Sequence, residues 1–377
     1  MFMNFRRVRK CKFLQIVFTC FILSALMLNW EQVDHHVVSH VKSYSYRYLI
    51  NSYEFINHSF SISHEKATSI GNFPYLMDHK DTCRGQDVLL LLFIKTSPVH
   101  FLRRQVIRST WGNQTYINRE LGVIVKVVFV MGIQPNGGRA IQKQLQTEDQ
   151  IHRDLVQQAF LDTFHNLTLK LLLQFRWAHA NCAHARFVMS ADDDVFVHVP
   201  NLVRELQVLS NQGVADLWIG HVHRGAPPNR RKDSKYYMPF QIYQWSSYPD
   251  YTAGAGYVVS ADVAAKIYQA TLSLNASFHI DDVFMGICAI TVGVSPQQHV
   301  YFSGEGKAPY HPCIFEKMIT SHGHVDDVRY LWKVATAPEV NGISSGFFGQ
   351  LYCTAVKIKL LCFPYFLNSY SCKAAFS

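Results

Sequence analysis

Two groups of consecutive aspartates, each set among apolar residues, are the parts of this sequence best suited to chemistry. Asp192, Asp193 and Asp194 follow FVMSA and precede VF, while Asp281 and Asp282 precede VFMG. Carboxylates packed together repel one another, and a divalent cation or cationic side chains usually offset that cost. The triplet therefore indicates a cation site, with an acidic turn on a solvated edge as the alternative.

The pair Asp281 and Asp282 is suited to proton transfer. Burial among apolar residues raises the affinity of a carboxyl group for protons and makes it a competent general base. Either aspartate can also cap the N-terminus of a helix, and the two roles do not exclude each other.

Basic residues follow the first apolar run after residue 87. Lys95 comes directly after that run, and Arg103, Arg104 and Arg108 lie on a helix predicted over 103–111. The last two arginines are four positions apart and share one helical face, an arrangement that suits a diphosphate. A solvated helix face with salt bridges is the alternative.

A third block combines aromatic residues with small ones. Trp245, Tyr248 and Tyr251 offer faces for stacking on sugars, and the small residues around Gly254 allow a ligand to approach the backbone closely. An aromatic core with a tight turn is the alternative. Farther along, His322 follows an apolar run and can supply an imidazole to a cation otherwise held by oxygen ligands.

The elements expected to position these residues alternate between strands and helices. We predict strands at 88–94, 126–131 and from 187, helices at 103–111 and 167–178, and a long polar-faced helix or pair of helices at 139–162. This alternation is typical of an α/β sheet with crossovers, whose ligands bind at the carboxyl ends of the strands. The aspartate triplet follows such an end. No P-loop or G-x-G-x-x-G pattern opens a helix after the first strand, so a glycine cradle for a nucleotide is not expected.

The N-terminus carries a membrane signal. Residues 1–12 contain five basic side chains, and residues 13–28 form an apolar run with no small-residue cleavage pattern after it. We predict a cytosolic tail at 1–12 and an uncleaved signal anchor at 13–30, with a cleaved signal peptide as the alternative. The positive charge before the run and Glu31 and Asp34 after it place the remaining chain in the lumen, as in a single-pass type II membrane protein.

The predicted lumenal part divides into three. Residues 31–82 resemble a stem, residues 83–340 a catalytic domain, and residues 341–377 a Cys-containing extension. The N-x-S/T triplets predict glycosylation at Asn57, Asn113, Asn166 and Asn275. Seven cysteines on this side predict disulfides with one thiol left over: Cys83, Cys182, Cys288, Cys313, Cys353, Cys362 and Cys372.

Composition and charge limit the class of protein to which this chain can belong. A hydrophobic fraction of 49% over 377 residues supports a large core. The net charge of +9 comes from scattered basic residues without a basic stripe, so we expect no nucleic-acid partner. Residues 356–366, VKIKLLCFPYF, could lie on a membrane surface. A terminal strand or helix pinned by a disulfide is the alternative.

The order of these blocks resembles glycosyltransferase family 31, the β1,3-galactosyl- and β1,3-N-acetylglucosaminyltransferases. The resemblance spans roughly residues 85–335 and rests on RSTWG at 108–112, NLTLK at 166–170, DDDVF at 192–196, YPDYTAGAGYVVS at 248–260 and DDVFMG at 281–286. It implies an α/β fold of the GT-A type, formed by a single lumenal catalytic domain behind the anchor in the Golgi membrane.

The resemblance also implies a donor site. Asp192, Asp193 and Asp194 would bind Mn²⁺ (or Mg²⁺) on the diphosphate of a UDP-sugar, with Asp194 the direct ligand and His322 a second one. The basic residues that would lie near the nucleotide are Lys95, Arg104 and Arg108. The acceptor would be contacted by Trp245, Tyr248, Tyr251 and Gly254.

The implied reaction is an inverting β1,3 transfer with Asp282 as the base. Asp281 remains an alternative, because the family often has Glu-Asp where this chain has Asp-Asp. The expected donor is UDP-GlcNAc, and the expected acceptor is the 3-hydroxyl of a terminal galactose on a glycolipid. The other functions considered are a β1,3-galactosyltransferase using UDP-Gal, a non-catalytic lectin of the same fold and a divalent-metal hydrolase.

Overall fold

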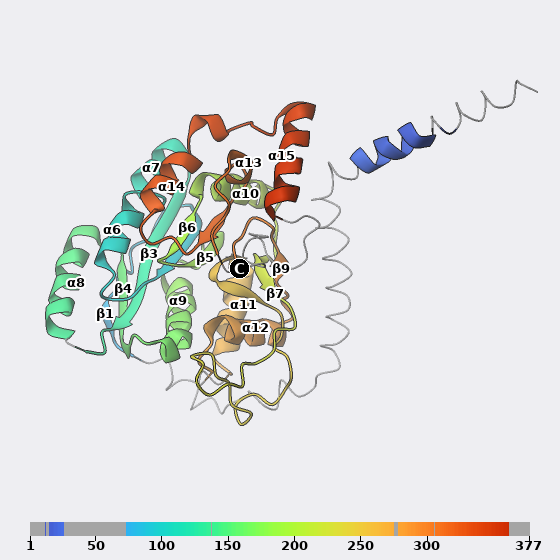
Figure 1. The fold of residues 1–377 in the computed structure, drawn as a ribbon. Coiled ribbons are helices and arrows are strands. Elements are labelled where there is room, and N and C mark those ends of the chain that lie inside the picture. The colour runs from blue at the N-terminus through green and yellow to red at the C-terminus, as the bar shows by residue number, and fades with distance from the viewer. Residues whose placement is uncertain are drawn as a thin grey trace, which may run out of the picture.

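A computed structural model describes residues 12, 15–25, 73–136, 138–274, 278–304 and 306–361. Its centre is an eight-stranded mixed sheet with the order β1-β4-β3-β2-β5-β8-β7-β9 (Figure 1). A two-stranded sheet pairs β6 with β10. The bounds of the strands are β1 Tyr75–Met77, β2 Val88–Lys95, β3 Ile124–Ile133, β4 Leu155–Leu161, β5 Phe187–Asp192, β6 Val195–Val197, β7 Trp218–His223, β8 Tyr251–Ser260, β9 Gln297–Gln298 and β10 Thr320–His322.

The middle of the sheet is parallel, and antiparallel pairs lie on both sides of it. Strands β4, β3, β2 and β5 run parallel to one another, whereas β8 runs antiparallel to both β5 and β7. Every residue of β2 is buried, as expected for a strand covered on both faces. The strands predicted at 88–94, at 126–131 and from 187 are confirmed as β2, β3 and β5.

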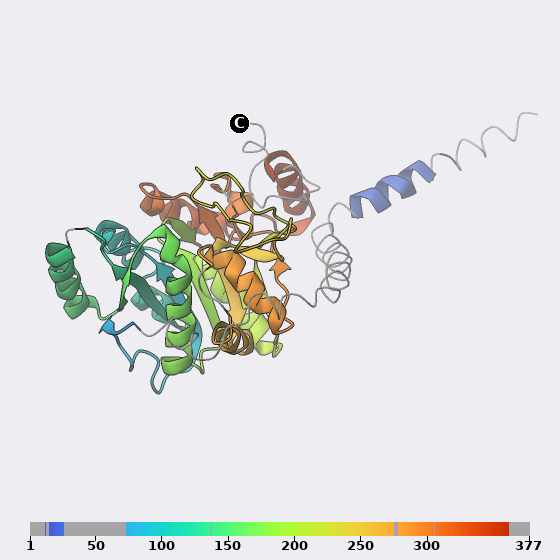
Figure 2. The ribbon, with the colours of Figure 1, turned by 90° about the horizontal axis from the view of Figure 1, so that it is seen from below.

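Helices cover both faces of the sheet. Buried residues of α9, α11 and α12 pack on one face, and those of α6, α7, α8, α10 and α14 pack on the other. Figure 2 shows α11 and α14 on opposite sides of the sheet. The bounds are α6 Phe101–Arg108, α7 Gln114–Glu120, α8 Gly138–His152, η2 Phe164–Asn166, α9 Leu167–Asn181, α10 Val199–Asn211, α11 Ala261–Thr271, α12 Asp281–Thr291, α13 Pro312–Phe315, α14 Val328–Ala335, η3 Pro338–Val340 and α15 Gly346–Leu361.

The prediction of a helix or pair of helices over 139–162 is wrong in its second half. Helix α8 ends at His152, and residues 155–161 form β4. The buried Gln157 broke the apolar pattern that would have identified a strand. Its side-chain amide donates to the backbone oxygen of Gly132 at 2.8 Å and its carbonyl accepts from Gln142 at 2.7 Å, so its polarity is satisfied inside the fold.

Two disulfides tie distant segments to the sheet. Cys83–Cys182 joins the segment before β2 to the residue that ends α9. The other joins α13 to α15 and so fixes the C-terminal helix. Cys288 on α12 is a buried free thiol. The remaining two cysteines of the predicted lumenal set, 362 and 372, lie outside the described residues.

The predicted anchor at 13–30 is described only in part. Residues 15–25 are helical. Within the described ranges, no helix combines the length and apolar character needed to cross a membrane. The cytosolic tail and stem predictions fall almost entirely outside those ranges, as does the end of the 356–366 segment. The start of that segment belongs to α15, which a disulfide pins to the body as the alternative interpretation expected.

Candidate active site

Lys95 joins the two groups of aspartates. It is the last residue of β2 and pairs in parallel register with Asp192, the last residue of β5. Its Nζ lies 3.2 Å from an Asp192 carboxylate oxygen and 3.1 Å from one of Asp281, and it donates to the backbone oxygen of Gly254 at 3.0 Å. Three elements therefore converge on one buried ammonium at the carboxyl edge of the parallel strands.

The charges of this cluster depend on one another. Burial alone would lower the pKa of Lys95, but the carboxylates of Asp192 and Asp281 outweigh it and raise that pKa above its usual value. Burial raises the pKa of Asp192, and the nearby Asp281 and Asp194 raise it further while Lys95 opposes them. The ammonium thus opposes the rise in the pKa of Asp192 that burial and the neighbouring carboxylates cause.

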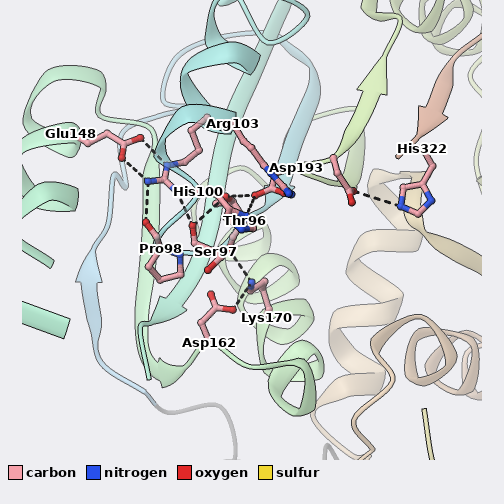
Figure 3. Close-up of polar contacts among 12 residues, drawn as sticks. Thr96, Ser97, Pro98, His100, Arg103, Glu148, Asp162, Lys170, Asp193 and His322 are labelled. Atoms are coloured by element: carbon pink, nitrogen blue, oxygen red, sulfur yellow. Dashed lines mark hydrogen bonds and ion pairs between the residues drawn. The ribbon is translucent and has the colours of Figure 1, made fainter. Parts of the chain in front are cut away.

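Asp193 fixes the loop between β2 and α6. Its carboxylate accepts from Thr96 Oγ1 at 2.6 Å, contacts His100 Nδ1 at 2.7 Å and accepts from Arg103 at 2.6 Å (Figure 3). Burial opposes ionisation, yet these hydrogen bonds lower the pKa of Asp193. Lys170 supports the same loop, donating to the backbone oxygen of Thr96 and to Asp162, both at 2.9 Å. Asp193, the middle aspartate of the triplet, therefore holds the backbone of the β2–α6 loop in place.

The two arginines predicted near the diphosphate are engaged inside the fold. Arg104 is fully buried and binds Glu148 through two hydrogen bonds of 2.8 and 2.7 Å (Figure 3). It also donates to the backbone oxygen of Ser97 at 2.8 Å. Arg108 binds Asp154 through two 2.8 Å bonds and reaches Glu148 at 2.7 Å. Arg104 thus holds the loop after β2 to α8, and Arg108 holds the end of α6 to α8 and to Asp154, the residue before β4.

Asp194 and His322 face each other across the small sheet. Strand β10 pairs His322 with Val195, so the imidazole Nε2 lies 3.6 Å from Asp194 Oδ1 (Figure 3). That carboxylate oxygen is buried and lacks a hydrogen-bond partner in the described part of the chain. The His322 imidazole lowers the pKa of Asp194. A carboxylate and an imidazole are suitable donors for Mn²⁺, which other oxygen ligands would complete.

The triplet and His322 do not form a complete protein cage for a metal. Within the described residues, no group of three or more His, Cys, Asp or Glu side chains is arranged to hold one. Asp192 and Asp193 are directed to Lys95 and to the β2–α6 loop, so a cation beside Asp194 would need diphosphate oxygens and water as further ligands.

A buried chain of hydrogen bonds holds the strand that carries His322. Ser321 Oγ lies 2.6 Å from His324 Nε2, and His324 Nδ1 lies 2.9 Å from Asp327. The backbone N–H of His324 donates to the backbone oxygen of Asp194 at 2.7 Å. Ser321 is fully buried, so despite its serine–histidine–aspartate order the chain has no accessible nucleophile. This chain of hydrogen bonds therefore links the segment that carries His322 to the backbone of Asp194.

Asp281 and Asp282 occupy the first turn of α12, after the N-cap residue Ile280. The positive end of the helix dipole favours negative charge there. Asp281 is bound to Lys95, whereas Asp282 accepts from the backbone of Val283 at 2.7 Å. Burial and the neighbouring Asp281 raise the pKa of Asp282 to about 7. Two adjacent carboxyl groups therefore differ: one is held in an ion pair, and the other is ready to exchange a proton near neutral pH.

The aromatic block is divided between the core and this site. Tyr248 and Tyr251 are buried, and Trp245 is half-buried against the same core cluster. The alternative of an aromatic core therefore describes much of the block. Gly254 differs, because a Cβ there would lie 3.5 Å from Lys95 Nζ and 3.6 Å from Asp282 Oδ2. The absence of a side chain keeps open the space beside Asp282.

Two of the four predicted glycosylation sites are described. Asn113 caps α7, and its side-chain oxygen accepts from the Tyr116 backbone. Asn166 precedes α9 and donates its amide to the Leu161 oxygen at 2.8 Å. Asn57 and Asn275 lie outside the described residues. Modification of Asn113 would leave its capping oxygen in place, whereas modification of Asn166 would change a group already in a hydrogen bond.

Comparison with known proteins identifies the chain. Residues 102–300 match the Galactosyltransferase family. The chain belongs to this family. The sequence is 71% identical over 379 aligned residues to lactosylceramide 1,3-N-acetyl-beta-D-glucosaminyltransferase A of Danio rerio, covering 100% of both chains. It is 56% identical to lactosylceramide 1,3-N-acetyl-beta-D-glucosaminyltransferase of Homo sapiens, covering 100% of this chain and 99% of that one.

A structural comparison adds little to this family assignment. A crystal structure of 4-diphosphocytidyl-2C-methyl-D-erythritol synthase matches 66% of this galactosyltransferase family member and 98% of the other chain. The TM-score is 0.33 at 8% sequence identity, which is too weak a likeness to argue from.

The Lys95 ion-pair cluster generates a stability prediction for this galactosyltransferase family member. Lys95→Met leaves the buried Asp281 without its cation and removes a partner of the more exposed Asp192, so the free energy of unfolding should fall by about 3–5 kcal/mol. Urea denaturation measures the loss, and Lys333→Met, which removes an exposed lysine, is the matched control. Adding Asp281→Asn should recover part of the loss in a double-mutant cycle. Equal stability of Lys95→Met and the control would show that the cluster does not hold the site together.

Proposed function

We propose that the protein is an inverting glycosyltransferase that moves GlcNAc from UDP-GlcNAc to the 3-hydroxyl of the terminal galactose of lactosylceramide. Relatives at 56–71% identity, which are named lactosylceramide 1,3-N-acetyl-beta-D-glucosaminyltransferases, support this donor and acceptor. So do the blocks HRGAPP at 223–228, SKYY at 234–237 and FSGEGKAPYHPC at 302–313, which resemble the same enzymes. The observation that carries the proposal is Asp282, whose raised pKa and position next to the side-chain-free Gly254 suit a base acting on a hydroxyl.

The fold supports assignment to the GT-A type. Its parallel strands end at a carboxylate-rich edge, where ligands bind in open α/β sheets. Asp194 and His322 would hold Mn²⁺, because a buried carboxylate oxygen without a hydrogen bond and an imidazole face each other there. The bound cation supplies positive charge to the diphosphate as it departs.

The proposed reaction is one in-line displacement. The Asp282 carboxylate takes the proton from the acceptor 3-hydroxyl while that oxygen forms a bond to the anomeric carbon of the sugar. The bond from this carbon to UDP breaks, and UDP leaves with the electron pair. Asp281 cannot easily share the task, because its carboxylate is paired with Lys95. Its negative charge instead raises the pKa of Asp282.

The remaining predicted site residues have supporting roles. Lys95 holds the two aspartate blocks together, and Asp193 shapes the β2–α6 loop on which the nucleotide would rest. We assign Arg104 and Arg108 to positioning this loop and the helix after it. Their side chains are bound to Glu148 and Asp154 and do not need to contact the nucleotide. Trp245, the least buried of the three aromatic residues, is the best placed to stack on the acceptor.

We further propose that the enzyme is a type II protein of the Golgi membrane. The basic residues before the apolar run at 13–28 and the acidic residues after it support this orientation. The two disulfides in the described part support an oxidising compartment for the catalytic region.

Replacing the base should stop transfer without preventing donor binding. Asp282→Asn should lower kcat by about 10²–10⁴-fold, because the acceptor hydroxyl loses its proton acceptor. Mn²⁺-dependent binding of UDP, measured by calorimetry, should change little. Asp281→Asn is the matched variant and should retain more transfer. Abolished transfer in Asp281→Asn with strong transfer in Asp282→Asn would move the base to Asp281.

The rate should depend on the protonation of Asp282. A base with a pKa of about 7 is protonated at lower pH, so kcat/KM should fall up to tenfold per unit below pH 7. In Asp281→Asn this fall in kcat/KM should begin at lower pH, since the neighbouring charge that raises the Asp282 pKa is gone. UDP binding over the same pH range controls for loss of the donor. If kcat/KM falls at the same pH in Asp281→Asn as in the wild type, the Asp281 charge does not raise the pKa of Asp282.

Asp194 should be required for the metal-dependent part of donor binding. Asp194→Ala should weaken Mn²⁺-dependent binding of UDP at least tenfold in calorimetry, because the cation loses a carboxylate ligand. Asp326→Ala, which removes an exposed carboxylate near the same strand, is the control. Equal UDP affinity of the two variants would exclude Asp194 from the metal site.

A further inference from the structure

A cavity lies away from the candidate active site. It has a volume of about 500 Å³, within the usual range of sites for small molecules. Its lining combines the segment after β1, the start of β3 and the residues between α8 and β4: Asp78, His79, Lys80, Asp81, Thr82, Gln114, Lys126, Val127, Arg153 and Asp154. Lys126 pairs with Leu91, which precedes Lys95 by four residues on β2. The cavity wall therefore begins about 13 Å from Lys95 along the strands.

The charges in this cavity favour an anion. The carboxylates in its wall already have partners: Asp81 pairs with Arg84, Asp154 with Arg108, and Asp78 accepts from the indole of Trp177. By contrast, three cationic side chains of the wall have no hydrogen-bond or ion-pair partner within the described part of the chain. They are Lys80, Lys126 and Arg153.

Two local features distinguish this wall from an ordinary surface. Lys126 is half-buried, and burial lowers its pKa with no carboxylate opposing the effect. Arg153 has a φ of 52°, a backbone conformation that costs a non-glycine residue energy. The chain therefore keeps a partly desolvated ammonium and a strained arginine in one hollow without a charge partner, which an anionic ligand would provide.

We propose that this cavity binds a sugar carrying one tetrahedral oxyanion, as a phosphate or sulfate ester. Lys126 and Arg153 contact the oxyanion, since charge-assisted hydrogen bonds would offset the partial burial of Lys126 and give the exposed Arg153 a charge partner. The cavity is larger than a bare ion requires, and its neutral polar residues Gln114 and Thr82 suit sugar hydroxyls. The site is separate from the aspartate groups and does not depend on the function proposed for them.

Calorimetry on the full chain in detergent tests this site with glucose 6-phosphate, glucose 6-sulfate and uncharged glucose. At least one ester should bind saturably and glucose should not; which ester binds better distinguishes a phosphorylated from a sulfated ligand. Lys126→Met should weaken binding at least tenfold, because it removes one charge-assisted contact. Lys333→Met, which removes an exposed lysine elsewhere, should leave binding unchanged.

Arg153→Gly separates loss of the site from loss of the fold. Glycine adopts the positive φ at this position without strain, so thermal stability should be kept or increased while ester binding falls. The proposal is overturned if neither ester binds saturably to the wild-type chain, if glucose binds as well as the esters, or if Lys126→Met and a stably folded Arg153→Gly bind like the wild type.

Discussion

The ion pairs of Lys95 are the interaction on which the rest of the site depends. Parallel register places this residue beside Asp192, and α12 brings Asp281 to the same ammonium. The buried carboxylate of Asp281 and the half-buried carboxylate of Asp192 would repel each other without a cation between them. A single cation compensates for both, and its additional bond to the Gly254 oxygen fixes β8 in the same place. The two halves of the proposed chemistry are thus held in one rigid arrangement.

The three aspartates of the triplet have different roles although they are adjacent in sequence. Asp192 pairs with Lys95, Asp193 holds the loop after β2, and Asp194 faces His322. The reason is the turn between β5 and β6, which sends successive side chains toward three different elements. An interpretation of the triplet as three equivalent metal ligands would therefore miss two structural roles.

Much of the fold could be predicted from local sequence, whereas the roles of charged side chains depended on distant partners. The continuous apolar run of β2 identified a buried strand, and the aspartates after β5 identified a strand end. Arg104 and Arg108 had the spacing of an anion site, but Glu148 and Asp154, 44 and 46 residues away, neutralise them. Nothing in the local pattern indicates these pairs.

Thr96 and His100 are further residues that sequence reasoning missed. Both bind Asp193, and the only signal for them is their position directly after a predicted strand. Gln157 hid β4 for the opposite reason, because a polar side chain satisfied by the Gly132 oxygen looks in sequence like an exposed one. Which of two adjacent aspartates is paired also required coordinates, since sequence gives both the same surroundings.

The buried thiol of Cys288 is an internal reporter for α12, the helix that carries the proposed base. It lies on α12, two turns after the aspartates, and burial raises its pKa well above the usual range. Because the thiolate is the form that reacts, alkylation requires the helix to open and admit both water and reagent. The rate at which this sulfur is modified would therefore follow the opening of the segment that carries Asp281 and Asp282, independently of turnover.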